Sequence, residues 1–159
     1  ERDGSVITAV TPEEVLRAID QVIPFIELPD LVVQAPAPPK FNGAGITAIN
    51  VGARLGVMGT PIEAKATPEF SNAMRDFVAI VKGDGAELDR GKGSDVLGHP
   101  LNAVVWLAKD MARSGHAMKK GDLISLGSFS KLLPPKAGLA VEVIYEGLPG
   151  NPAVTVSFK

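Results

Sequence analysis

Two segments of the chain carry apolar residues at helical spacing. The first begins with Thr11-Pro12-Glu13-Glu14, which can form a capping box with proline at the first helical position. Its apolar stripe consists of Val15, Ile19 and Val22. The second segment runs from about Pro100 to about Ser114 and is followed by Gly115, a residue typical of helix ends. The pattern therefore predicts one shorter helix and one long helix.

The remaining pattern favours strands and turns. Residues 77–81 and a return through Leu88, joined by Gly83-Asp84-Gly85, predict a hairpin. Three further alternating segments predict strands at Leu123–Leu126, Val141–Tyr145 and Val154–Phe158. Proline and glycine interrupt residues 34–45, which predicts an ordered surface loop or lid. A strand-rich body that carries one long helix corresponds to an α+β fold.

Size and charge exclude several classes of partner. The chain has 159 residues, the size of one domain, and a formal net charge of -2 at pH 7. This balance gives no electrostatic footprint for nucleic acid, and no apolar run reaches the roughly 18 residues that span a bilayer. We therefore expect no nucleic-acid partner and no membrane partner. We expect a cytoplasmic location; an exported or periplasmic one stays open, because the chain does not begin with an initiator Met and has no cysteine.

Several common catalytic motifs are missing from the sequence, which contains neither a G-x-S-x-G elbow nor an H-E-x-x-H motif. The two histidines, His99 and His116, flank the predicted long helix, where a polar cap and a cation that complements the helix dipole are structural roles. Residues 91–94 resemble the end of a phosphate-binding loop, but Gly93 replaces the required Ser or Thr. We expect no Ser-His hydrolase, zinc site or nucleotide site.

Two segments contain candidate site residues. Glu27 lies within the apolar run Val22–Asp30, where a buried carboxylate would need a partner, and a divalent cation with oxygen ligands is the functional interpretation. The structural alternative is a turn-facing or salt-bridged glutamate. The run Ser125–Lys131 ends a predicted strand in small residues, whose N–H groups and hydroxyls can hold a carboxylate or an enolate oxygen. The structural alternative there is an ordinary β-turn.

One block of sequence is distinctive, namely Leu97-Gly98-His99-Pro100-Leu101-Asn102-Ala103. Further segments of the same pattern are Arg90–Ser94, Lys120–Ile124, Leu126–Ser128, Ala137-Gly138 and Val154–Phe158, together with Val22–Asp30 and Asn50 upstream. In combination they resemble the hydratase and decarboxylase branch of the fumarylacetoacetate hydrolase superfamily, the branch of the 2-keto-4-pentenoate hydratases and 4-oxalocrotonate decarboxylases. The resemblance covers nearly the whole chain.

The resemblance implies a mixed β-sandwich or roll that binds Mg²⁺ or Mn²⁺ through three carboxylates. Two of these come from a Glu-x-Glu or Glu-x-Asp pair on one strand, and by position Glu27 matches the third. Asn50, Gly127 and Ser128 are then expected to line the pocket for a small 2-keto acid substrate. Lys131, which has no place in the family pattern, is a candidate to pair with the substrate carboxylate. Family members are usually oligomeric, so a homo-oligomer is expected.

The acidic pair of the family pattern has no counterpart ahead of Glu27. We therefore expect a single hydratase-like domain over residues 1–159 that lacks its N-terminal portion. The acidic pair is then expected to lie N-terminal to Glu1, and the missing N-terminal segment is a candidate partner of this chain. The leading hypothesis is a divalent-metal-dependent lyase acting on 2-keto or 2-hydroxydienoic acids. The alternatives are a non-catalytic module of the same fold and a hydrolase that cleaves a C–C bond of an acylpyruvate.

Overall fold

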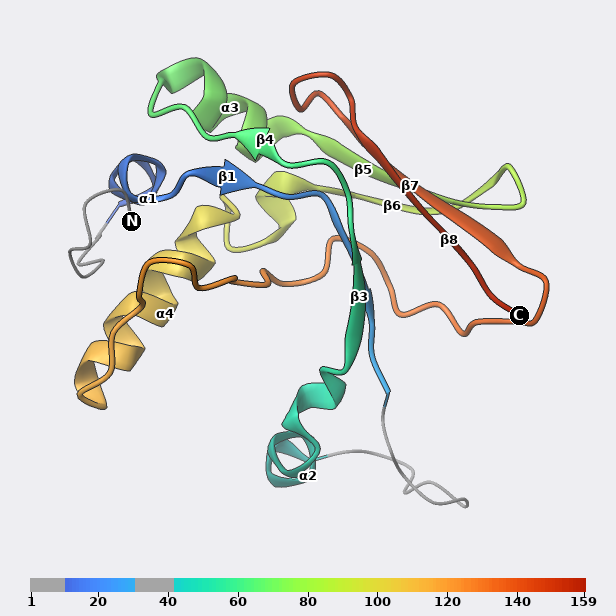
Figure 1. The fold of residues 1–159 in the computed structure, drawn as a ribbon, viewed down its shortest axis with the longest axis horizontal. Helices are drawn as coiled ribbons and strands as arrows, with labels where there is room; N and C mark the ends of the chain where they lie inside the picture. Colours follow the sequence, from blue (N-terminus) through green and yellow to red (C-terminus); the bar gives the residue numbers. More distant parts are fainter. Residues whose placement is uncertain (1–10, 31–41) are drawn as a thin grey trace.

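The computed structural model describes residues 11–30 and 42–159 and shows an α+β fold (Figure 1), which confirms the predicted class. The main sheet has four antiparallel strands in the order β6-β5-β7-β8: β5 (Val78–Gly83), β6 (Ala86–Lys92), β7 (Ala140–Glu146) and β8 (Ala153–Ser157). The other described strands form two antiparallel ribbons. These pair β1 (Gln21–Val22) with β4 (Ile62–Glu63), and β2 (Phe25–Leu28) with β3 (Leu55–Met58).

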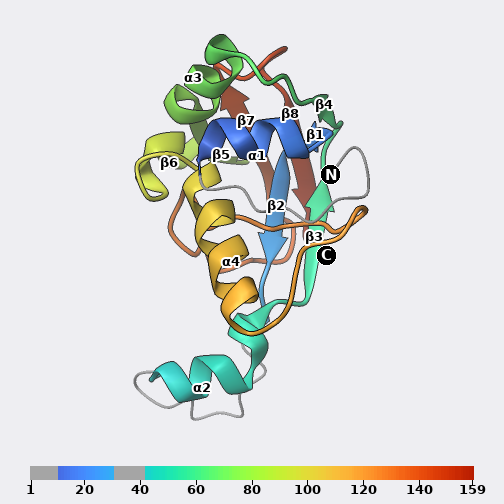
Figure 2. The same ribbon diagram turned by 90° about the vertical axis from the view of Figure 1, so that its left-hand side faces the viewer.

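Helices cover one side of this sheet. Helix α1 (Pro12–Ala18) packs against both α3 (Pro68–Asp76) and α4 (Leu101–Arg113). Figure 2 shows α1 and α4 in front of the strands of the main sheet, whereas the short α2 (Gly43–Ala48) lies at the end of the molecule remote from α3. Two 3₁₀ turns, Asn50–Gly52 and Gly93–Asp95, complete the described elements. Among the described residues no helix is long and apolar enough to cross a bilayer.

The core lies between the main sheet and the helices. Alternate residues of β5, β7 and β8 point inward, as the two-residue period of a strand requires. The most deeply buried side chains of this core include Val15 and Leu16 of α1, Val104 of α4, Ala79 of β5 and Val154 of β8. The Phe77 ring, at the start of β5, contacts the Phe129 ring edge-on at a centroid distance of 5.0 Å. This contact connects the irregular segment after α4 to the core.

The predicted helix signals are confirmed. The Thr11 hydroxyl accepts from the N–H of Glu14, and the Glu14 carboxylate accepts from the N–H of Thr11 at 2.9 Å. Gly115 follows α4 with φ 71, a left-handed conformation that glycine adopts without strain. The predicted hairpin corresponds to β5 and β6, and the last two predicted strands correspond to β7 and β8.

Four local features were predicted wrongly or incompletely. Residues 123–126 do alternate, with Ile124 and Leu126 half-buried, but among the described residues no strand pairs with them, so they form no ladder. Helix α3 was missed, although Thr67-Pro68-Glu69 repeats the start signal of the first helix. Val22 belongs to β1, because the chain becomes extended at Ile19. Of the predicted loop 34–45, residues 34–41 lie outside the described residues, as do residues 1–10, and Gly43–Gly45 begin α2.

Candidate functional site

Glu27 lies on the exposed face of the β2–β3 ribbon. Ile26 and Val57 pack against the core, so the residues that alternate with them point the opposite way. This outer face of the ribbon consists of Phe25 and Glu27 on β2 and Gly56 and Met58 on β3. The apolar run around Glu27 therefore does not bury its carboxylate, which is exposed and has no hydrogen bond or ion pair to any described residue.

A side chain from the main sheet holds the start of β2. The Tyr145 hydroxyl donates to the carbonyl oxygen of Phe25 at 2.6 Å and accepts from the N–H of Phe25 at 3.2 Å. Tyr145 is buried, and burial raises the pKa of its hydroxyl, so the group stays protonated and able to donate. No sequence signal pointed to this contact, because the two residues lie 120 positions apart.

Asn50 begins a short left-handed turn between α2 and β3. Asn50, Val51 and Gly52 have φ values of 52, 57 and 73. A branched side chain such as that of Val51 is strained in this region, whereas glycine is not. The Gly52 carbonyl accepts from the N–H of Asp30 at 2.8 Å, and Asp30 also pairs with Arg54 at 2.6 Å. These contacts place the Asn50 turn beside the C-terminal end of β2, the strand that carries Glu27.

Gly127, Ser128 and Lys131 belong to an irregular segment that follows the outer edge of β6. The Ser128 hydroxyl donates to the carbonyl of Ser130 at 2.8 Å, so its hydrogen is used within the turn. The N–H of Lys131 donates to the Asp89 carboxylate at 2.8 Å, which contributes to holding the pKa of that carboxyl below its usual range, while the Lys131 side chain is exposed. Within the described residues no hydrogen bond or ion pair joins Gly127, Ser128 or Lys131 to Glu27.

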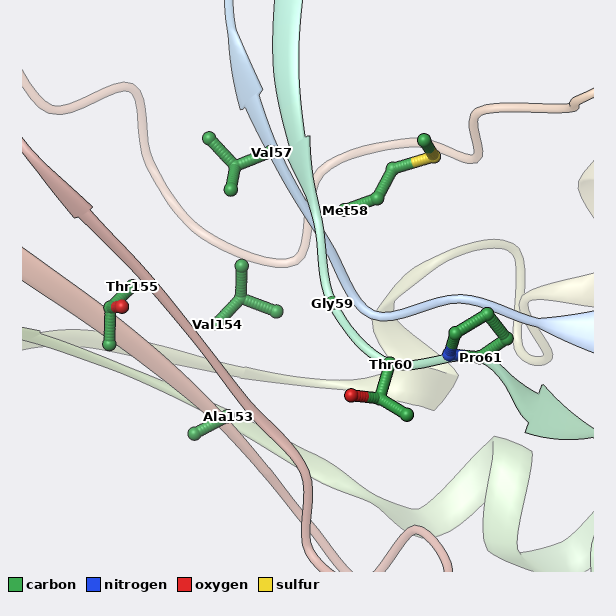
Figure 3. A pocket seen from close by; sticks show the side chains of 8 residues that line it. All are labelled: Val57, Met58, Gly59, Thr60, Pro61, Ala153, Val154 and Thr155. Carbon is green, nitrogen blue, oxygen red and sulfur yellow. The ribbon is translucent and has the colours of Figure 1, made fainter.

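Two shallow hollows lie beside the two-stranded ribbons. The first, of about 430 Å³, opens between the end of β3 and β8 (Figure 3) and is lined by Val57, Met58, Gly59, Thr60, Pro61, Ala153, Val154 and Thr155. The second, of about 710 Å³, is lined by Asp20, Gln21, Pro61, Glu63 and Lys120. Neither contains a predicted site residue, although the first adjoins Gly56, which faces Glu27 across the ribbon.

Glu27 fits a divalent cation as one ligand of several. Its carboxylate is exposed and has the oxygen donors that Mg²⁺ and Mn²⁺ prefer. Over residues 11–30 and 42–159, however, no group of three or more His, Cys, Asp or Glu residues could hold a metal ion. Hard cations take about six oxygen ligands, so Glu27 would need water, substrate or further polypeptide to complete the coordination.

The most distinctive sequence block has a structural role at the start of α4. His99 accepts from the N–H of Leu101 at Nδ1, at 3.2 Å, and its Nε2 lies 3.1 Å from the carbonyl oxygen of Ser71. These partners assign the proton to Nε2. The Asn102 amide donates to the carbonyl of Leu97 at 2.8 Å, where the chain has a φ of 54. His99 thus has the polar role expected at the start of the helix, since it accepts from the first N–H of α4, although the N-cap residue itself is Pro100.

His99 makes stability depend on pH. Burial lowers the pKa of His99, so the unfolded chain binds this proton more readily than the folded chain does. The contribution is fully present above about pH 6.5, the ordinary value for histidine, and is lost as the pH falls toward the folded pKa. We expect the free energy of unfolding to fall on acidification below about pH 6.5. Urea unfolding at several pH values measures this fall. The variant His99→Asn keeps a hydrogen-bond acceptor at the start of α4 and should lose the part of the pH dependence that His99 causes. If the pH dependence of stability were the same in His99→Asn as in the unsubstituted chain, the assignment to His99 would be contradicted.

Sequence comparison finds curated relatives, although no family model matches the chain. The chain is 32% identical over 139 residues to 2-keto-4-pentenoate hydratase of Paraburkholderia xenovorans (strain LB400), covering 87% of this chain and 49% of the relative. It is 31% identical over 147 residues to the TodF product hydratase of Pseudomonas putida (strain F1), covering 92% and 51%. The chain thus spans about half the length of the curated relatives it matches.

Structure comparison agrees with these matches. The fold resembles 4-oxalocrotonate decarboxylase from Pseudomonas putida G7 in complex with magnesium and adipate, with a TM-score of 0.78 and 27% identity. The match covers 92% of this chain and 52% of that one. A second structure of that enzyme, with calcium and acetate, gives a TM-score of 0.75 and 26% identity.

The fold and these matches together relate the chain to part of the fumarylacetoacetate-hydrolase-like domain. The chain is homologous to the C-terminal part of the 2-keto-4-pentenoate hydratases and 4-oxalocrotonate decarboxylase. The resemblance inferred from the Leu97–Ala103 block is confirmed.

Proposed function

We propose that this chain forms part of a divalent-metal-dependent lyase, of the hydratase or decarboxylase type, that acts on 2-keto or 2-hydroxydienoic acids. The observation that carries the proposal is the close match, over 92% of the chain, to a decarboxylase bound to magnesium and a dicarboxylate. The exposed Glu27 carboxylate supports it, because its oxygens are accessible to a cation.

The chemistry requires binding of a carboxylate and an adjacent C2 oxygen. A divalent cation, when bound, would stabilise negative charge on that oxygen while a proton moves along the conjugated chain. Glu27 would hold the cation through a carboxylate oxygen. Asn50, in the turn beside the C-terminal end of β2, would donate its amide to the substrate, and the backbone at Gly127 and Ser128 would provide further donors. Lys131, whose side chain is exposed, would pair with a substrate carboxylate.

The remaining oxygen ligands would come from outside the described residues. We propose Mg²⁺ or Mn²⁺ as the metal, since both take carboxylate and water oxygens. We also propose that the active form is a homo-oligomer. Light scattering tests this, because a monomer has a mass of 16.6 kDa.

The activity test uses this chain with a 2-hydroxydienoate as substrate. We expect loss of its ultraviolet absorbance in the presence of Mg²⁺ and no loss after EDTA is added. An equal rate with and without EDTA would overturn the metal-dependent mechanism. No activity under either condition would overturn catalysis by this chain and favour a non-catalytic module of the same fold.

A further inference from the structure

The backbone of β2 is fixed at one point by a buried hydroxyl. Tyr145, on β7, is 6% exposed, and its hydroxyl bonds to both backbone polar groups of Phe25. A hydroxyl can donate and accept at the same time, which is what a neighbouring strand would do at this position. Among the described strands none pairs with the edge of β2 that faces away from β3, and Tyr145 takes the place of a strand partner there.

These two hydrogen bonds determine how β2 is rotated about its own axis. The N–H and C=O of Phe25 point toward Tyr145 and so away from β3. Because the backbone directions of a strand repeat every two residues, those of Glu27 also point away from β3. The N–H of Asp30, which bonds to Gly52 on the opposite side, is consistent with this alternation. Fixing Phe25 therefore fixes the direction of the Glu27 side chain two residues later.

The Phe25 ring completes the arrangement on the outer face of the ribbon. A Cβ atom built at Gly56 would overlap ring atoms of Phe25, so the ring lies directly over this glycine. Gly56 is also the residue opposite Glu27 in the β2–β3 register. The half-buried ring therefore forms a wall beside the Glu27 carboxylate and restricts the positions that this side chain can take.

We propose that Tyr145 is a positioning residue for Glu27, acting through the Phe25 backbone and through the Phe25 ring packed over Gly56. This inference rests on the proposed function, in which Glu27 is a metal ligand. Its role differs from a general contribution to stability, because loss of the hydroxyl would release β2 next to Glu27 while the phenyl ring still fills the core.

The test measures binding of Mn²⁺ alone by its paramagnetic broadening of backbone amide signals in the ¹⁵N NMR spectrum of the chain. In the unsubstituted protein we expect broadening centred on Gly56 and its neighbours, and Glu27→Gln should remove it. Tyr145→Phe should weaken the apparent Mn²⁺ affinity about 10-fold, the range seen when a group that orients a metal ligand is lost. Gly56→Ala, which displaces the Phe25 ring on an exposed face, should weaken it as well.

The matched control is Val143→Ala, which also removes buried atoms from β7 but makes no bond to β2. We expect it to lower stability while leaving Mn²⁺ affinity within about 2-fold, since sites without shared partners behave independently. Broadening that Glu27→Gln removes but Tyr145→Phe and Gly56→Ala leave unchanged would overturn the positioning role alone. No broadening near Gly56 in the unsubstituted protein would overturn the assignment of Glu27 as a metal ligand, and this inference with it.

Discussion

Replacement of Glu27 by glutamine is expected to abolish metal-dependent turnover of a 2-hydroxydienoate without disturbing the fold. The amide has nearly the same shape as the carboxylate, but it is neutral and binds hard cations poorly. Because Glu27 is exposed and makes no hydrogen bond or ion pair within the described residues, its charge contributes little to stability there. We expect the rate with Mg²⁺ to fall by about 100-fold or more, measured from the loss of ultraviolet absorbance.

The control for this variant is Glu63→Gln, which removes another exposed strand carboxylate, on β4. Its turnover should equal that of the unsubstituted chain, and circular dichroism should show both variants folded. Turnover that survives in Glu27→Gln would show that Glu27 is not a metal ligand. Equal losses in both variants would show that net charge, and not the position of Glu27, determines the rate.

Replacement of Gly91 by alanine should have the largest effect on stability. Gly91 is buried on β6, and a Cβ atom there would overlap the backbone carbonyl of Phe129. Phe129 cannot retreat freely, because its ring packs against Phe77 and the next segment is bonded to Asp89. Since two backbones meet at this point, no side-chain rotation relieves the overlap. We expect a loss of at least about 3 kcal/mol in the free energy of unfolding, measured with urea.

Gly127→Ala is the matched control, since it also adds one methyl group to the same contact region. A Cβ atom at Gly127 would lie 3.8 Å from a methyl carbon of Val96, which is an ordinary van der Waals distance. The expected change in stability is under about 1 kcal/mol. If Gly91→Ala were as stable as Gly127→Ala, the segment 127–131 would not be packed against β6 as the structure has it.

Local sequence signals predicted the elements that depend on neighbouring residues. The Thr11 capping box, the Gly115 helix end and the hairpin through Gly83-Asp84-Gly85 all form as expected, because each uses bonds within a few positions of the chain. The segment 123–126 shows the limit of such signals. Its alternation between exposed and half-buried residues is correct, yet a strand needs a partner, and the pattern along one segment does not supply it.

The sequence predicted only part of the candidate site, because the rest depends on contacts that no local pattern supplies. Glu27 was selected as an unusual carboxylate in an apolar run, but the run suggested burial, whereas the two-residue period of β2 turns Glu27 outward while Ile26 faces the core. The proximity of the Asn50 turn to the end of β2 depends on a bond between Asp30 and Gly52, which lie 22 positions apart and share no sequence pattern.

By itself, the sequence determined the α+β class, the ends of the long helix and the relationship to the hydratases and decarboxylases, since these depend on local bonding and on one distinctive block. Only the tertiary structure decided that His99 reaches the carbonyl of Ser71, that Tyr145 holds β2, and that Phe129 lies against Gly91. The physical reason is that these contacts join residues far apart in the chain. Their geometry is determined by how sheet and helices pack, and no spacing along the sequence encodes it.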